Sequence, residues 1–192
     1  MVPTPIIAGN VSFYNESKDK PIPPSPIISC LGRIQDVKKA ITMSFKRENS
    51  SIILIGKRKN ELGGSIFYDL HNELGKNVPT PDLNEVKNQI YGITDCIEKG
   101  LVFACHDISE GGVAASLCEM AFGNSIGCSV NIESELSTEK ILFSETGGFI
   151  LEAKNENIES IHSIFNQYKL EAYAIGITGG NKIKLNNAIN IT

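Results

Sequence analysis

Residues 102–122 read VFACHDISEGGVAASLCEMAF, and this stretch decides the fold class. It begins with an apolar run, ending at His106, of the length and composition typical of a buried strand. A polar, glycine-rich turn follows over 107–112, and the small and apolar residues of 113–122 are typical of a helix that packs closely on a sheet. A strand, a turn and a helix in direct succession indicate an α/β domain.

Apolar runs on either side extend this alternation of strands and helices. We expect further strands over 51–56, 127–132, 148–153, 172–178 and 182–185, and further helices over 83–100 and 158–168. Two pairs of successive strands have no helix between them, which argues against a purely parallel sheet. The sequence therefore predicts an α/β (α+β) fold in which helices pack on a mixed sheet.

The helix over 83–100 carries the clearest signal. Pro81 and Asp82 supply a start and Gly100 supplies a stop. Apolar residues recur at steps of three and four, which predicts one buried face. That face would consist of Leu83, Val86, Ile90, Ile93 and Ile97.

The first 32 residues differ from the rest. Apolar runs over 6–14 and 27–31 predict two strands, and four prolines between 21 and 26 require a turn or loop between them. Two strands are marginal in isolation, so we expect them to join a sheet whose other strands lie outside these 192 residues, or to extend the next domain's sheet. The predicted domains are 1–32 and 33–192.

Composition excludes several classes of protein. Hydrophobic residues make up 41% and charged residues 21%, as in an ordinary globular domain. The net charge is −4 without a long Lys/Arg run, so we expect no nucleic-acid partner. No window approaches the ~20 apolar residues that cross a bilayer, and we expect a cytoplasmic chain with no membrane contact. The five cysteines form no CxxC pair, which predicts reduced thiols and no zinc site.

The first candidate site is Gly9-Asn10-Val11-Ser12, within the first apolar run. Gly9 would let the backbone approach a ligand closely, and the carboxamide oxygen of Asn10 is a hard ligand suited to Mg²⁺. The hydroxyl of Ser12 would lie on the same face of a strand as Asn10. The alternative is a strand end in which glycine and asparagine only form a turn.

The second candidate is the turn over 106–112. The following helix offers free N–H groups and the positive end of its dipole, which suit phosphate. Alternatively, Asp107 or Ser109 caps the helix, and the paired glycines permit close packing. His106 beside Asp107 suggests acid–base chemistry, but neighbouring residues of a strand point to opposite faces.

Two other segments have weaker signals. Ser144-Glu145-Thr146 could bind a ligand hydroxyl, or form a plain β-hairpin loop. Gly63-Gly64-Ser65 lacks the surrounding residues of a phosphate-binding loop. The basic run from Lys57 to Lys59 is expected to be a solvated loop.

Together these segments resemble the large subunit of phosphoribosylformylglycinamidine synthase. The matching stretches, in the family's order, are PIIAGNVSFYNE (5–16), PIPPSP (21–26), GRIQDV (32–37), ELGGS (61–65), HDISEGGVA (106–114) and LFSE (142–145). GNVSFYNE is specific to this family, whereas the HD-x-S-x-GG and GGS stretches are shared with ATP-dependent relatives such as aminoimidazole ribonucleotide synthetase and selenophosphate synthetase.

The resemblance implies an architecture. The family carries two tandem copies of an ATP-binding half and a companion half. Residues 1–32 resemble the terminal strands of the second ATP-binding half. Residues 33–192 resemble the second companion domain, whose fold is that of the C-terminal domain of aminoimidazole ribonucleotide synthetase.

The resemblance also implies a reaction and residue roles. ATP activates the amide oxygen of formylglycinamide ribonucleotide, and glutamine-derived ammonia displaces phosphate to give formylglycinamidine ribonucleotide in de novo purine biosynthesis. By position, Gly9 would contact ATP, Asn10 would ligate Mg²⁺ and Ser12 would contact formylglycinamide ribonucleotide.

The family's catalytic histidine and most carboxylate metal ligands belong to the first half of the subunit. We therefore expect no catalytic residue in this chain, and no activity without the N-terminal part of the subunit, a glutaminase subunit and a small bridging subunit. The family's substrate turn in the first companion domain reads Ser-Glu-Gln. Here Thr146 replaces the glutamine, and we expect no substrate contact there.

Other hypotheses remain open. The chain could be a truncated piece or the product of a divided gene. It could also be a non-catalytic domain that binds nucleotide or serves as a scaffold. A different ATP-dependent member of the superfamily is a third hypothesis, against which GNVSFYNE stands.

Overall fold

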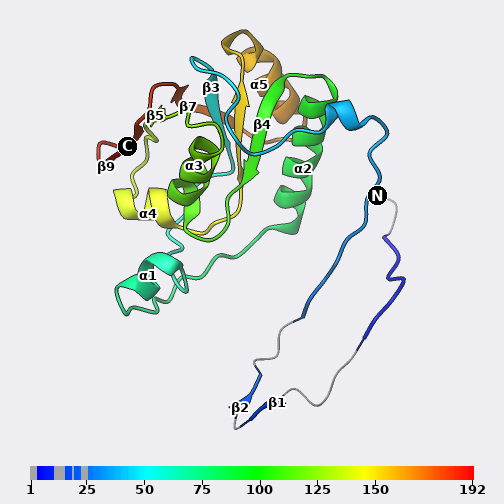
Figure 1. The fold of residues 1–192 in the computed structure, drawn as a ribbon, viewed down its shortest axis with the longest axis vertical. Helices are drawn as coiled ribbons and strands as arrows, with labels where there is room; N and C mark the ends of the chain where they lie inside the picture. Colours follow the sequence, from blue (N-terminus) through cyan, green and yellow to red (C-terminus); the bar gives the residue numbers. More distant parts are fainter. Residues whose placement is uncertain (1–3, 11–15, 19, 23–25) are drawn as a thin grey trace. The chain divides into compact units, whose positions relative to one another are not determined.

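The computed structural model describes residues 4–10, 16–18, 20–22 and 26–192 (Figure 1). The chain divides into two compact units, Met1–Gln35 and Asp36–Thr192. Among the described residues, no helix is long and apolar enough to cross a membrane.

The second unit is built on a mixed sheet. In the described chain its strands lie in the order β4-β6-β3-β7-β5-β8-β9, and all neighbours are antiparallel except β5 and β8. The strands are β3 Ser51–Ile55, β4 Val102–Asp107, β5 Cys128–Val130, β6 Phe149–Ala153, β7 Ala172–Thr178, β8 Ile183–Leu185 and β9 Ile189–Ile191. The predicted mixed sheet with packed helices is confirmed.

Helices cover the sheet on both faces. They are α1 Ile66–Leu70, α2 Leu83–Glu98, α3 Gly112–Phe122, α4 Thr138–Phe143 and α5 Ile158–Gln167, with short 3-10 turns at Val37–Lys39 and Asn155–Asn157. Apolar side chains of α3 and α4 pack into one core, and those of α2 and α5 pack into another. The result is a three-layer arrangement with the sheet in the middle (Figure 1).

Strand β3 divides the two cores. All five of its residues are buried. Ile52 and Leu54 belong to the core beneath α3 and α4, whereas Ile53 and Ile55 belong to the core beneath α2 and α5. This alternation follows from the two-residue period of a strand.

The buried face of α2 differs from the predicted one. Its N-terminus is confirmed, because the Asp82 carboxylate accepts hydrogen bonds from two backbone amides of the first turn, at 2.8 and 3.3 Å. However, Leu83 is 79% exposed and Ile90 is 48% exposed. The residues that are buried are Gln89, Gly92, Ile93 and Cys96. Apolarity did not mark this face because it includes a glycine and a glutamine, and Gly92 lies where Phe165 of α5 approaches closely.

Three helices and strands of the second unit were not predicted, namely α1, α4 and β9. The six-residue helix α4 separates β5 from β6, so the prediction that these strands follow one another directly was wrong. Helices of one or two turns show little periodicity, which explains why α1 and α4 gave no signal. The other strands and helices of the second unit lie within a few residues of their predicted positions.

The first unit contains little regular structure. Strands β1 Glu16–Ser17 and β2 Lys20–Pro21 pair as a short antiparallel hairpin. The described residues 6–10 and 27–31 form no strand, so the prediction of strands there was wrong, and residues 11–15 lie outside the described residues. Ile6 and Ile27 are each 93% exposed. An apolar run becomes a strand only where another strand pairs with it, and none of the described residues pairs with these runs.

Close packing of Gly92 on α2 against Phe165 on α5 can be tested by mutation. A Cβ at this position would lie 2.6 Å from the ring of Phe165 on α5. Alanine would raise the helix propensity of α2 by about 1 kcal/mol, but crowding a packed core costs about 1–3 kcal/mol. We expect Gly92→Ala to lower the urea midpoint of unfolding. In a Phe165→Leu background the added methyl has room and the loss should disappear. A higher midpoint for Gly92→Ala alone would contradict this packing.

Candidate functional site

The segment with Gly9 and Asn10 is the first candidate. Both residues are exposed and lie outside any strand, and no described atom would lie within 4 Å of a Cβ added to Gly9. Ser12 lies outside the described residues. Mg²⁺ takes six oxygen ligands, of which Asn10 could provide one, and no group of three or more His, Cys, Asp or Glu that could hold a metal ion occurs among the described residues.

The described chain therefore fits one side of a magnesium–nucleotide site at most. The flexible backbone of Gly9 and the carboxamide of Asn10 are suited to that side. The remaining ligands would have to come from other residues. The roles assigned to Gly9, Asn10 and Ser12 stay predictions.

The turn between β4 and α3 is the second candidate. The residue at the N-terminal cap of helix α3 is Gly111, which has φ +77° and ψ 0°. The cap position therefore provides no side-chain hydrogen bond to the helix. The alternative in which Asp107 or Ser109 caps the helix is therefore wrong. A Cβ on Gly112 would lie 2.7–2.9 Å from the backbone of Leu142 and Phe143. The paired glycines thus do permit close packing, although against the end of α4.

The carboxylate of Glu145 takes the place of a helix cap. Its Oε1 accepts hydrogen bonds from the backbone amides of Gly111 at 3.0 Å and of Ile66 at 2.9 Å. These amides lie at the starts of α3 and α1. A negative charge at the N-terminus of a helix is stabilising. One amide of the predicted phosphate site is therefore already bonded to a carboxylate of the same domain.

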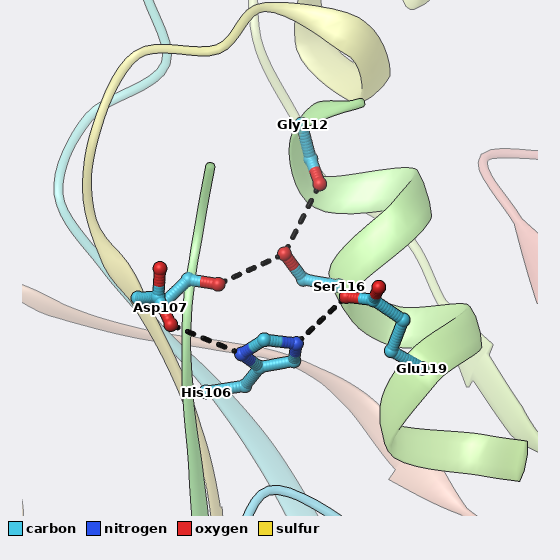
Figure 2. A network of polar contacts seen from close by, with 5 residues as sticks. All are labelled: His106, Asp107, Gly112, Ser116 and Glu119. Carbon is cyan, nitrogen blue, oxygen red and sulfur yellow. Dashed lines mark hydrogen bonds and ion pairs between the residues drawn. The ribbon is translucent and has the colours of Figure 1, made fainter. Parts of the chain in front are cut away.

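His106 bridges two carboxylates, as Figure 2 shows. Its Nδ1 lies 3.3 Å from Asp107 Oδ1, and its Nε2 lies 2.8 Å from Glu119 Oε2 on α3. The histidine side chain is 12% exposed, whereas the two carboxylates are 63% and 53% exposed. Both ring nitrogens thus face carboxylates of the same domain.

A second contact joins the same two elements. The hydroxyl of Ser116 on α3 lies 3.0 Å from the carbonyl oxygen of Asp107 and 3.1 Å from that of Gly112 (Figure 2). A hydroxyl that donates to carbonyl oxygens in this way satisfies a polar group inside a helix. Together with His106, it fixes α3 against the end of β4.

The third candidate, Ser144-Glu145-Thr146, is not a β-hairpin loop, because α4 precedes it and β6 follows it. The Ser144 hydroxyl donates to the Lys59 carbonyl oxygen at 2.8 Å and accepts from the Glu61 amide at 3.3 Å. The Thr146 hydroxyl donates to the Glu61 carboxylate at 2.8 Å. All three side chains of the turn bind other parts of the domain. The expectation that they do not contact substrate stays a prediction.

Arg58 is a residue whose role sequence reasoning missed. Its guanidinium donates to the carbonyl oxygens of Thr146 at 2.6 Å and Gly147 at 2.9 Å. Burial lowers the pKa of Arg58 to about 10, with the nearby carboxylates of Glu61 and Glu85 opposing this shift, so the group remains charged at neutral pH. The basic run was expected to be a solvated loop, and for Arg58 this was wrong. No local pattern marks an arginine that binds carbonyl groups far along the chain.

Residues 47–186 match the family described as AIR synthase related protein, C-terminal domain. The chain belongs to this family.

Within it, the chain is similar to one particular protein, the phosphoribosylformylglycinamidine synthase subunit PurL. It is 37% identical over 186 residues to PurL of Methanothrix thermoacetophila. This alignment covers 95% of this chain and 24% of that protein. It is 39% identical over 168 residues to PurL of Thermococcus sibiricus, in an alignment that covers 84% of this chain and 23% of that protein. The chain thus spans about a quarter of the length of these relatives, and is homologous to their C-terminal part.

Solved structures show the same fold. Thermotoga maritima PurL complexed with FGAR superimposes with a TM-score of 0.70 at 16% identity, over 81% of this chain and 29% of that one. The same protein complexed with ATP superimposes with a TM-score of 0.62 at 17% identity, over 81% of this chain and 26% of that one. The structure of PurLQS from Thermotoga maritima gives 0.64 at 18% identity, over 81% and 27%.

Glu145 generates a prediction about stability. Replacing it with alanine leaves the amides of Gly111 and Ile66 without their acceptor, and we expect a loss of about 1–3 kcal/mol in the free energy of unfolding. Both bonds end on one oxygen, so Glu145→Gln should retain most of the stability. Urea denaturation measures both. The matched control is Glu110→Ala, an exposed glutamate in the neighbouring turn. Equal effects of Glu145→Ala and Glu110→Ala would refute the capping role.

A double-mutant cycle tests the contact between β4 and α3. We expect a coupling of about 0.5–1 kcal/mol between His106→Ala and Glu119→Ala, because Glu119 is half exposed and its charge is screened. High salt should reduce this coupling. The control is the exposed pair Lys154 and Glu156, at 3.1 Å, for which we expect almost none. Equal coupling energies in the two cycles would show that the contact between His106 and Glu119 does not stabilise the domain.

Proposed function

We propose that the chain is the C-terminal part of an ATP-dependent carbon–nitrogen ligase. The enzyme converts formylglycinamide ribonucleotide, ATP and glutamine-derived ammonia to formylglycinamidine ribonucleotide, in the cytoplasm, as a step of de novo purine biosynthesis. The observation that carries the proposal is the 37% identity to PurL over 95% of this chain. That similarity is longer than the match to the companion-domain family over 47–186, so it includes much of the first unit.

The first unit supplies the proposed contacts. The backbone at Gly9 approaches ATP, the carboxamide oxygen of Asn10 binds Mg²⁺, and the hydroxyl of Ser12 orients formylglycinamide ribonucleotide. Bound ATP provides the phosphoryl group that activates the amide oxygen for displacement by ammonia. The residues of this chain contribute by positioning and by a neutral metal ligand rather than by moving a proton. A Thermotoga maritima relative complexed with ATP supports nucleotide as a ligand.

The site is completed by polypeptide other than these 192 residues. Support comes from the relatives, of which the chain spans about a quarter, and from the exposure of Gly9 and Asn10. The partners are therefore the N-terminal part of the subunit, a glutaminase subunit and a small bridging subunit. The PurLQS structure of Thermotoga maritima is an assembly of a relative. Alone, the chain is inactive.

The second candidate function is a non-catalytic domain that serves as a scaffold or binds nucleotide. One observation favours it: the polar side chains of the turns in the second unit, at His106, Ser144, Glu145 and Thr146, make contacts within the domain. Such a domain would be stable and well formed without taking part in a reaction. The two functions differ in whether added polypeptide restores turnover.

Complementation distinguishes them. The purified chain is mixed with ATP, Mg²⁺, formylglycinamide ribonucleotide and ammonia, with and without the first three quarters of a PurL subunit, and ADP release is measured. We expect turnover only in the complete mixture, because most metal ligands come from the added part. Turnover by the chain alone would disprove the assembly. If neither mixture shows turnover or nucleotide binding, the result would support the non-catalytic scaffold function instead.

Asn10 is tested in the complemented enzyme. Asn10→Ala removes one metal ligand, and we expect the Mg²⁺ concentration at half-maximal rate to rise at least about tenfold. The matched control is Asn84→Ala, which changes an exposed asparagine on α2 and should leave the Mg²⁺ dependence unchanged. An unchanged dependence for Asn10→Ala would remove its proposed role.

A further inference from the structure

The connection from β3 to α2 presents a run of exposed apolar side chains. The run, called here the apolar strip, consists of Ile66, Leu70, Leu74, Val78 and Leu83. Three of these five side chains, Leu70, Leu74 and Leu83, are 75%, 77% and 79% exposed. Single exposed apolar residues are ordinary, but a group of them on one segment marks a contact surface. Figure 1 shows α1 and the chain leading on to α2 lying beyond the end of the sheet.

The segment that carries the strip is held in a defined conformation. Backbone amides of Gly63 and Gly64 donate to the carbonyl oxygens of Asn77 at 2.7 Å and Leu74 at 2.8 Å. The ring of Tyr68 lies so close to Gly75 that a Cβ there would approach it to 2.6 Å. The segment therefore doubles back on itself and packs on its own residues, while its leucines point outward.

Helix α1 has one inner and one outer side. Phe67 stacks on Phe143 of α4, with ring centroids 4.6 Å apart and an interplanar angle of 15°. The Ile66 amide is bonded to Glu145. Ile66 and Leu70 are four residues apart, so they share another side of the helix, and both are exposed. Anchoring on one side fixes the direction in which the other side faces.

A surface that is ordered before it binds loses little conformational entropy on association. Exposed charged residues, Asp69, Glu73 and Lys76, alternate with the strip's members along the chain, but the strip itself is apolar, and the cores of permanent interfaces are rich in apolar residues. Both features suit a permanent contact better than a transient encounter. The relatives supply a candidate of this kind, since about three quarters of their length lies outside the part that this chain matches.

We propose that the apolar strip is the surface against which the preceding part of the ligase subunit packs. This inference rests on the proposed function, and it specifies where the missing polypeptide binds the companion domain. Leu70 and Leu74 lie in the middle of the strip and are the main anchors. Burial of such anchors at the centre of an interface dominates affinity.

Binding in trans tests the strip. The wild-type chain and the Leu70→Glu/Leu74→Glu variant are titrated with the first three quarters of the Methanothrix thermoacetophila PurL subunit in sedimentation experiments. We expect the double variant to bind at least about a hundredfold more weakly, because each buried charge costs roughly a factor of ten or more. Both side chains are exposed in the free chain, so far-UV circular dichroism and the urea midpoint should be unchanged.

The matched control is Phe122→Glu, which places the same charge at a 67% exposed apolar residue at the end of α3. It should bind like the wild type. If the wild type binds and the double variant binds equally well, the strip is not the contact surface, while the proposed function stands. If the wild type does not bind, both proposals fail. A wild-type dimer that the double variant converts to a monomer would assign the strip to a second copy and overturn the inference.

Discussion

Burial of β3 on both faces is the constraint on which the second unit depends. Ser51–Ile55 pairs with β6 along one edge and β7 along the other. Its backbone groups are therefore satisfied by neighbouring strands, as a buried backbone requires. Because its side chains alternate between two cores, helices must cover both faces of the sheet. The polar turns are then confined to the ends of strands, where they can meet one another.

Those turns meet around Glu145. Its carboxylate joins the starts of α1 and α3, and its neighbours Ser144 and Thr146 bind the loop that contains Lys59 and Glu61. We interpret the turn as the tie that holds the connection after β3 in place. The resemblance that assigns substrate contact to a Ser-Glu-Gln turn concerns another copy of the domain. In this chain the third residue of the turn is Thr146, and its hydroxyl donates to the Glu61 carboxylate.

Much of the fold could be predicted from local patterns, because β-branched runs such as that of β3 and stop signals such as Gly100 act over a few residues. The buried face of α2 could not, since Gly92 is buried only because Phe165 of α5 approaches it. Glu145 is similar: its two amide partners lie 34 and 79 residues away, and no short pattern encodes them. In the candidate site, the prediction at Gly9 and Asn10 rests on resemblance, and no described side chain completes it.

We propose that residues near Asn10 form one wall of a nucleotide–metal site whose other walls belong to different polypeptide. Amide hydrogen exchange over residues 4–10 tests it most directly, with β3 as the internal reference for a stable strand. We predict rapid exchange in the isolated chain, and slow exchange once the N-terminal part of a PurL subunit, ATP and Mg²⁺ are added. Protection equal to that of β3 in the isolated monomer, or unchanged rapid exchange in the active assembly, would contradict it.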